Sequence, residues 1–519
     1  MSTATLEHEN LRLTEEVNSL RTQLAEAKQQ LAWFKRQLFG RKSEKLRPIE
    51  GSGQGELLAG LTEAPQSPAP PPTETITYQR SKKRREQAVN DTGLRFDETV
   101  PVQVIEVAAP ELQGEGAEHY EVISTKSTFR LAQRPGSYVV LEYRRPVLKR
   151  RESSELISPP APTNVLEQSL ADVSFLAGML VDKFSYHLPL YRQHQRLAQS
   201  GIQLSRGTLT GLAGRAIELL RPIYDAQIEH ILASRVLAID ETPIKAGRKA
   251  PGQMRQAYFW PVYGQADEIA FYYAPSRAGA HVHAMLGKDF TGTLLSDGYE
   301  AYARYASARP EVTHAECWAH CRRYFERALE AEPRAAREAL QWIGALYTAE
   351  GKIAKLGLEG KAKLTARTRD CEPLVRGFWQ WCQAQCQRLD LLPRSPLAKA
   401  LQYALARVEA LQVFLADPEV PIDTNHLERG LRAIPMGRKN WLFCWTEIGA
   451  VHVGLIQSLL VTCRLHDVNP HTYLVDVLQR VGQHPASRVI ELTPRVWKKL
   501  FASNPLRSDV ELGGNNVAV

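Results

Sequence analysis

Residues 235–245 read RVLAIDETPIK, a short apolar run that ends in two acids and a Thr-Pro pair. The apolar part predicts a buried β-strand, so Asp240 stands where that strand ends. Burying an ionised carboxylate is costly unless a partner compensates its charge. Asp240 therefore either caps a turn or belongs to a site, and the choice depends on whether other carboxylates can reach it.

A second acid occupies the same position in a later strand. The stretch GTLLSDGYEAY, residues 292–302, places Asp297 at the C-terminal end of another apolar run. The segments from residue 235 onward read strand, strand, strand, helix, strand, helix, which is the order of an RNase H-like fold. In that order the first and fourth strands are neighbours, so Asp240 and Asp297 should lie close together. The adjacent Glu241 is expected to point to the other face, because successive strand residues alternate.

Two neighbouring carboxylates cannot both ionise without a cation, and Mg²⁺ or Mn²⁺ suits carboxylate oxygens. Two such ions, about 3.5–4 Å apart, need a third carboxylate. The stretch DTNHLERGLRAIPMGRKNWLF, residues 423–443, offers Glu428 on a helix that Asp423 or Thr424 can cap. The same stretch carries polar and basic residues that we expect to contact phosphate groups: Asn425, Arg429, Arg432, Arg438 and Lys439.

The first 47 residues are patterned in heptads. Two interleaved sets repeat every seven residues: Leu6, Leu13, Leu20, Ala27 and Phe34, and Asn10, Val17, Leu24, Leu31 and Leu38. This pattern predicts a coiled coil, and Asn10 at an a position favours a two-stranded parallel state. The alternative is one long helix packed on its own protein. Dimerisation, or a higher assembly through this helix, is the preferred interpretation.

Residues 48–88 are rich in Gly, Pro and Ser and predict a flexible linker. A basic run at residues 35–47 precedes it, and a second basic cluster closes it: Lys82, Lys83, Arg84 and Arg85. On a linker, these side chains are expected to contact DNA phosphates. Residues 89–160 hold three β-like runs and predict a small β-rich module.

Residues 161–233 turn helical. A candidate helix ends at Gly201, and Ser205 can cap the next one, which is the outline of a helix-turn-helix. An ordinary helical hairpin explains this pattern equally well. In the first interpretation, three residues at the start of the second helix would contact DNA: Arg206, Thr208 and Thr210.

The composition narrows the class of protein. The chain has 519 residues and a net charge of +8, so several domains and an anionic partner are expected. Its seven cysteines all follow position 316, an uneven set that favours reduced thiols in a cytoplasm. Neither a signal peptide nor a membrane span is expected. His314, Cys317, His320 and Cys321 lie close in sequence, but core packing is the preferred interpretation over zinc.

Five motifs along the chain resemble those of the large transposase subunit of the insertion-sequence-66 family: FKRQLFGRKSEKL, AIDETPIK, LLSDGYEAY, HAECWAHCRRYF and NHLERGLRAIPMGRKNWLF. The resemblance implies that Asp240, Asp297 and Glu428 form a DDE triad holding two Mg²⁺ or Mn²⁺ ions. It also implies that residues 331–417 are a helical insertion in the catalytic domain. Many relatives carry a cysteine-rich, zinc-finger-like region where this chain has none at residues 89–160, so no zinc is expected.

We therefore expect a multidomain α/β protein. Its catalytic core would comprise residues 234–330 and 418–470, followed by a helical tail at 471–519. The expected activity is cleavage of insertion-element ends, giving a 3′-OH that attacks target DNA. Partners would be the terminal repeats, target DNA and a second copy of the chain, with accessory proteins of the same element left open. Two alternatives are a structure-specific RNase H-like nuclease and a dimeric DNA-binding remnant without catalysis.

Overall fold

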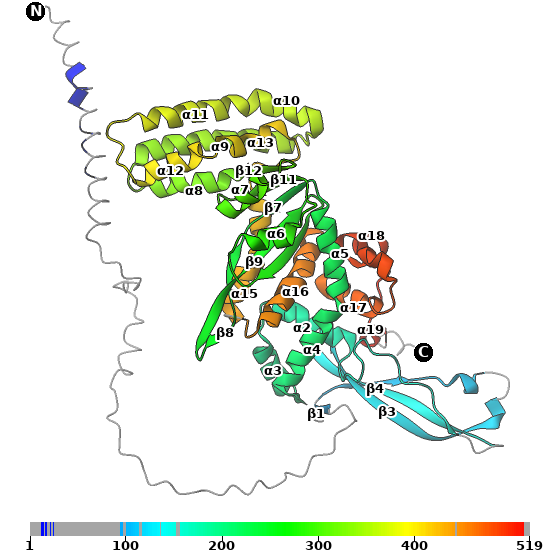
Figure 1. The fold of residues 1–519 in the computed structure, drawn as a ribbon. Coiled ribbons are helices and arrows are strands. Elements are labelled where there is room, and N and C mark those ends of the chain that lie inside the picture. Colours follow the sequence, from blue (N-terminus) through cyan, green and yellow to red (C-terminus); the bar gives the residue numbers. More distant parts are fainter. Residues whose placement is uncertain are drawn as a thin grey trace, which may run out of the picture. The chain divides into compact units, whose positions relative to one another are not determined.

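The computed structural model describes most of the chain after residue 93 and a few residues near the N-terminus (Figure 1). The described residues are 12–14, 16–17, 21, 24, 28, 94–96, 100–113, 117–134, 136–151, 156–441 and 444–512. The chain divides into two units, one made of residues 1–87 and 330–333, the other of residues 88–329 and 334–519.

In the first unit, the residues described between positions 12 and 28 are helical. The side chains of Leu13, Val17 and Leu24 are exposed there. Exposed apolar residues at heptad positions suit a helix that pairs with another helix, and the coiled coil stays a prediction. The other heptad positions, the linker and the basic residues 35–47 and 82–85 lie outside the described residues.

The first sheet of the second unit has four strands: β2 (Val102–Glu106), β3 (Tyr120–Arg134), β4 (Ser137–Arg150) and β5 (Leu156–Ile157). Most of this sheet is the long antiparallel pair β3–β4. β2 lies parallel to β4, on the edge of β4 that faces away from β3. The last described helix, α19 (Asp509–Leu512), docks on this sheet, where the Tyr143 hydroxyl donates to Asp509 at 2.7 Å. The end of the described chain thus packs against its first sheet.

Four helices follow: α2 (Val173–Phe184), α3 (Leu190–Gln199), α4 (Arg206–Leu219) and α5 (Arg221–Leu232). The turn between α3 and α4 contains Gly201 at a φ of +80°, a left-handed conformation that glycine adopts without strain. Ser205 caps α4 as expected, since its hydroxyl accepts the backbone N–H of Thr208 at 2.9 Å. The two helices pack against each other and on α2.

The central sheet contains six strands: β7 (Val236–Ile239), β8 (Thr242–Ala250), β9 (Gln253–Gly264), β10 (Glu268–Ala274), β11 (Gly292–Ser296) and β12 (Val312–Glu316). The strand order is β10-β9-β7-β11-β12, with β8 paired to β9. β7, β11 and β12 are parallel, whereas β9 and β10 are antiparallel to their neighbours. All four residues of β7 are buried, because helices cover both faces of such strands. The expected contact between the strands ending at Asp240 and Asp297 is confirmed by the pairing of β7 with β11.

β8 was not expected from the sequence, because the Thr242–Pro243 pair disfavours the interior of a strand. Proline lacks an N–H, but among the described strands β8 pairs with β9 alone, so Pro243 lies in an edge strand that needs no strand hydrogen bond on its other side. The chain therefore continues through Pro243 into a long β8–β9 hairpin (Figure 1).

Helices pack around the central sheet and extend beyond it. Those inside or directly after the strands are α6 (Ala280–Leu286), α7 (Glu300–Ser307) and α8 (Trp318–Ala328). A helical group follows: α9 (Pro333–Lys355), α10 (Gly360–Asp370), α11 (Glu372–Cys386), α12 (Pro396–Leu405) and α13 (Val408–Ala416). The C-terminal helices are α14 (Asn425–Leu431), α15 (Ala433–Trp441), α16 (Glu447–Leu465), α17 (Pro470–Arg480) and α18 (Pro494–Leu500). Trp318 of α8 packs on Phe378 of α11, with ring centroids 5.4 Å apart, and so joins the helical group to the core.

Among the described residues, α16 alone has the length and hydropathy of a membrane-spanning helix. About 67% of its most apolar window is buried inside the protein. It packs on β10, where the Ser458 hydroxyl accepts the backbone N–H of Phe271 at 2.8 Å. Its apolar character is therefore explained by its place in the core.

Candidate active site

Asp240 and Asp297 follow the C-terminal ends of adjacent parallel strands. Ala238 of β7 lies opposite Leu295 of β11, so the residue two positions beyond each, Asp240 and Asp297, continues the same register. Carboxylate oxygens of Asp240, Asp297 and Glu241 lie within 4.8 Å of one another. The buried register of two strands thus brings together Asp240 and Asp297, which lie far apart in the sequence.

The expectation that Glu241 points away from this pair is wrong. β7 ends at Ile239 and β8 begins at Thr242, so Glu241 lies in a turn where strand alternation does not apply. Its side chain is only 4% exposed, and its carboxylate accepts hydrogen bonds from the Tyr302 hydroxyl and the Arg277 guanidinium. Glu241 is therefore part of the acid cluster.

Glu428 reaches the cluster from α14, far along the chain. Three hydrogen bonds anchor the region: Cys317 N–H donates to Ser296 at 3.0 Å, Trp318 N–H donates to Ile422 at 3.1 Å, and Thr424 N–H donates to the Cys317 thiol at 3.3 Å. They tie the end of β11 to the start of α8, and α8 to the segment before α14. This anchoring positions Glu428 beside the strand ends.

Ligand atoms of Asp240, Glu428 and His320 also lie within 4.8 Å of one another. Among the described residues, two groups of possible metal ligands result, and both contain Asp240. Neither group contains Asp297 and Glu428 together. In the sequence, His320 was considered as part of a candidate zinc cluster and not as part of the acid site. The signal that could have placed it there is its position, one helical turn after the strand Val312–Glu316.

Three arginines neutralise acids around this cluster. Arg277 pairs with Glu241, Arg323 donates to both carboxylate oxygens of Glu428 at 2.5 and 2.6 Å, and Arg407 pairs with Glu316 at 2.8 Å. Glu316 is not among the acids that the sequence predicts for the site. In the structure it is the buried last residue of β12, opposite Ser296 of β11.

Burial raises the pKa of Asp240 to about 7, and the negative charges of Glu241, Asp297 and Glu428 add to the effect. One interaction opposes the shift, since the Glu241 N–H donates to an Asp240 oxygen at 2.7 Å. Burial also raises the pKa of Glu316 to about 7, and burial beside Arg323 lowers the pKa of His320. Both carboxyl pKa values are thus raised chiefly by burial, and at Asp240 the neighbouring acids add to the effect.

The four residues of the candidate zinc cluster take different partners. His314 lies 2.8 Å from the Ser296 hydroxyl, and Cys317 accepts hydrogen bonds from Thr424. Cys321 is fully buried, whereas His320 faces Asp240 and Glu428. The packing interpretation of both cysteines fits these contacts, and the zinc content of the protein stays a prediction.

The residues expected to contact DNA lie apart from the acid cluster or at its edge. At the start of α4, Arg206 and Thr210 are exposed and Thr208 is half-buried. On α14 and α15, the exposed side chains are Arg429, Arg432 and Lys439. Two have protein partners instead: Asn425 donates to the Asp423 carboxylate, and Arg438 to the carbonyl of Pro243.

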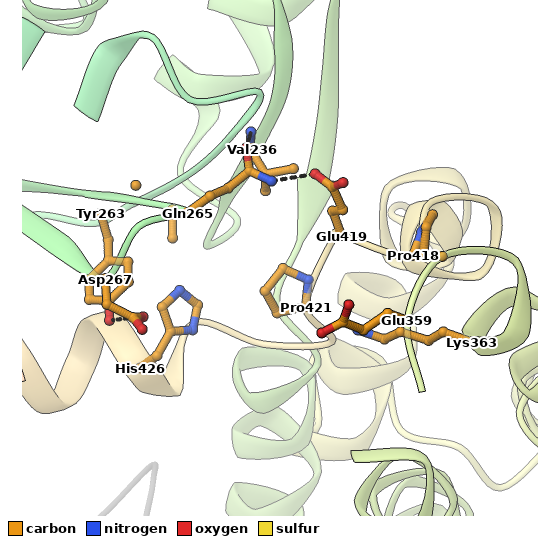
Figure 2. A pocket seen from close by; sticks show the side chains of 13 residues that line it. Val236, Tyr263, Gln265, Asp267, Glu359, Lys363, Pro418, Glu419, Pro421 and His426 are labelled. Carbon is orange, nitrogen blue, oxygen red and sulfur yellow. Dashed lines mark hydrogen bonds between the residues drawn. The ribbon is translucent and has the colours of Figure 1, made fainter. Parts of the chain in front are cut away.

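A cavity of about 770 Å³ lies at the opposite end of β7, beside Val236 (Figure 2). Figure 2 shows His426 of α14 next to Tyr263, whose hydroxyl donates to Asp267 at 2.7 Å. None of the clustered acids lines it. This cavity is therefore separate from the candidate active site, although α14 contributes a residue to each.

Comparisons with known proteins cover most of the chain. The family model described as Transposase IS66 family matches residues 168–452. The model described as IS66 C-terminal element matches residues 458–495, and that described as Transposase C of IS166 homeodomain matches residues 26–105.

Three similar proteins come from Sinorhizobium fredii (strain NBRC 101917 / NGR234). The uncharacterized protein y4hP is 32% identical over 398 residues, which cover 72% of this chain and 71% of the relative. The uncharacterized protein y4qI is 28% identical over 412 residues, 76% of each chain. The uncharacterized protein y4jD is 28% identical over 524 residues, which cover 95% of this chain and 98% of the relative.

Proposed function

Because this chain belongs to the IS66 family of transposases, as its motifs indicate, we propose that it is a DDE transposase. It cleaves the ends of its insertion element and joins the resulting 3′-OH to target DNA. The observation that carries this proposal is the convergence of three acids at one sheet edge: Asp240 and Asp297 from adjacent strands, and Glu428 from α14.

The strand order supports an RNase H-like core. Three antiparallel strands followed by two parallel ones, with the first strand between the second and the fourth, is the arrangement expected from the sequence if the edge strand β8 is set aside. In this proposal, residues 234–330 and 418–470 form the core and residues 331–417 are the helical insertion. Residues 161–233 are the helix-turn-helix domain that binds the element ends.

The acid cluster suits hard divalent cations such as Mg²⁺ or Mn²⁺. Carboxylate oxygens predominate in both groups of possible ligands, and the shared residue Asp240 suits a pair of ions. Asp240, Asp297 and Glu428 would hold the ions, and we add Glu241 and His320 to this set. Bound Mg²⁺ would supply charge stabilisation for the entering and leaving oxygens of the phosphodiester.

The protein's own backbone and side chains orient this site. The Glu241 N–H fixes one Asp240 oxygen, and the rigid strand β7 limits its movement. Arg277 and Arg323 hold the carboxylates of Glu241 and Glu428 in place. These contacts supply the preorganisation that phosphoryl transfer requires.

DNA binding is supported by basic surfaces on several elements. The β8–β9 segment, residues 242–266, contains no acid and exposes four basic side chains: Lys245, Arg248, Lys249 and Arg255. Arg206 on α4 and residues 82–85 of the linker are proposed to add contacts to the element ends. The match of residues 26–105 to a model described as a homeodomain also favours DNA contact, and the N-terminal heptads favour a dimer.

The test is a strand-transfer assay with the matching element ends, target DNA and Mg²⁺. The wild-type chain should cleave the ends and join them, and Asp297→Ala should bind the ends but do neither. Cleavage without joining would favour the nuclease. Binding without cleavage by the wild type would favour the DNA-binding remnant, and loss of binding in Asp297→Ala would mean that the acid is structural.

A further inference from the structure

A smaller cavity of about 330 Å³ opens beside Asp297, between the acid cluster and the helical group. Four arginines line it: Arg277, Arg323, Arg327 and Arg407. Asp297 is the one carboxylate among its lining residues. The cavity is therefore strongly basic at its wall, although it lies next to a concentration of acids.

The four guanidinium groups are not equally engaged. Three of them neutralise an acid of the neighbouring cluster, as described above for Glu241, Glu428 and Glu316. Arg327 is exposed and has no carboxylate partner among the described residues. Its guanidinium carbon lies 5.2 Å from the centre of the Tyr324 ring. The Arg327 guanidinium can thus bind an anion without first breaking an ion pair.

Aromatic rings alternate with these arginines. Tyr324 of α8 stacks on Tyr403 of α12, with ring centroids 4.1 Å apart and an interplanar angle of 18°. Arg407 lies over Tyr403, and Arg277 over Tyr299, each 4.0 Å from the ring centre. Basic groups interleaved with aromatic faces bind nucleotides, because the arginines take the phosphate and the rings stack on the base.

The floor of the cavity depends on close packing at Gly298. Arg407 donates to the carbonyls of Gly298 and Tyr403, each at 3.2 Å. A Cβ at residue 298 would come within 2.7 Å of the Tyr403 ring and 2.8 Å of Arg407. Because residue 298 has no side chain, the backbone directly after Asp297 can lie against the arginine–tyrosine wall.

We propose that this arginine–tyrosine pocket binds a single nucleotide of the DNA strand next to the reacting phosphodiester. Tyr403 offers no face to a base, because Tyr324 lies on one side of its ring and Arg407 on the other. The base therefore stacks on the outer face of Tyr324, and the exposed Arg327, which lies over that ring, moves to hold the phosphate. The volume lies at the lower end of the range for small-ligand pockets, about 300–1,000 Å³, so the pocket admits one nucleotide and excludes a duplex. The inference rests on the proposed function, since it takes the neighbouring acids as the place of reaction.

The pocket also gives the helical group a role. Tyr403 lies on α12 of the helical group, and Tyr324 and Arg327 lie on α8. The wall of the pocket therefore forms where the helical group meets the core. Arg277 and Arg323 become available to phosphate when the charge of Glu241 and Glu428 is otherwise compensated. Binding of the strand would then follow the loading of the acid cluster.

The test uses the full chain with Mg²⁺ and a trinucleotide that carries 5-iododeoxyuridine, which cross-links to aromatic side chains on illumination. Mass spectrometry should find the label on Tyr324. Arg327→Ala should lower the labelling at equal probe concentration by about tenfold, because a charge-assisted contact is lost. Arg322→Ala is the matched control, since Arg322 lies on the same helix, pairs with Glu326 and does not line the cavity.

Labelling spread over other surfaces, or unchanged by Arg327→Ala, would overturn the proposal. Inorganic phosphate should compete far more weakly than the unlabelled trinucleotide, and equal competition would overturn the assignment of a nucleotide. The strand-transfer assay separates the two claims. Joining by the wild type without labelling of Tyr324 rejects the pocket alone, whereas labelling without cleavage or joining rejects the proposed function.

Discussion

The two ends of β7 carry similar residue types and behave differently. At its start, Arg235 pairs with Asp417 and Glu419, and this pairing lowers the pKa of both carboxyl groups. At its other end, burial raises the pKa of Asp240 to about 7. The first end is stabilised by matched charges, whereas the second keeps acids that the protein compensates only in part. This difference agrees with the proposal that the active site lies at the second end.

The largest expected effect is on the pH dependence of stability in a metal-free protein. The folded-state pKa of Asp240 is raised from 3.8 to about 7, so its contribution is fully present below pH 4 and is lost as pH rises to 7. Because one pKa unit corresponds to about 1.4 kcal/mol, the loss is up to about 4 kcal/mol. Urea unfolding in EDTA at several pH values should show it.

Asp240→Asn is the variant for this measurement, since it removes the titrating group and keeps its shape. The fall in unfolding free energy between pH 4 and 7 should be smaller in the variant than in the wild type. Asp417→Asn, at the other end of β7, should not reduce that fall. If Asp240→Asn and the wild type show the same pH dependence, the acid cluster does not strain the fold.

The next effect concerns Glu241, whose place in the cluster only the structure indicates. Glu241→Gln keeps the hydrogen bond from Tyr302 and removes the charge. Cleavage of element ends should fall by about 10–100-fold, as for residues that support a metal site. Glu419→Gln, at the other end of β7, should cleave at the wild-type rate. Normal cleavage by Glu241→Gln would mean that the role of this residue is purely structural.

The contrast between Asp240 and Glu241 explains how far the sequence predicts the site. Asp240 and Asp297 were predicted because each ends an apolar run, and paired parallel strands carry that position into space. The position of Glu241 in the acid cluster and the edge strand β8 were not predicted, because both depend on the path of the chain directly after β7. The pairings of Arg323 and Arg407 with acids join distant segments, and no local pattern encodes them.

The smallest effect is expected from Tyr263→Phe in the cavity of Figure 2. The change removes the hydroxyl that donates to Asp267 at 2.7 Å, and the exposed carboxylate can bind water instead. The free energy of unfolding should fall by about 0.5–1 kcal/mol, measured by urea unfolding, with unchanged cleavage. The His426 ring lies 4.7 Å from the Tyr263 ring and belongs to the helix that carries Glu428. A fall in cleavage beyond about tenfold would therefore mean that α14 couples the two ends of β7, since a hydrogen bond of this size cannot account for it otherwise.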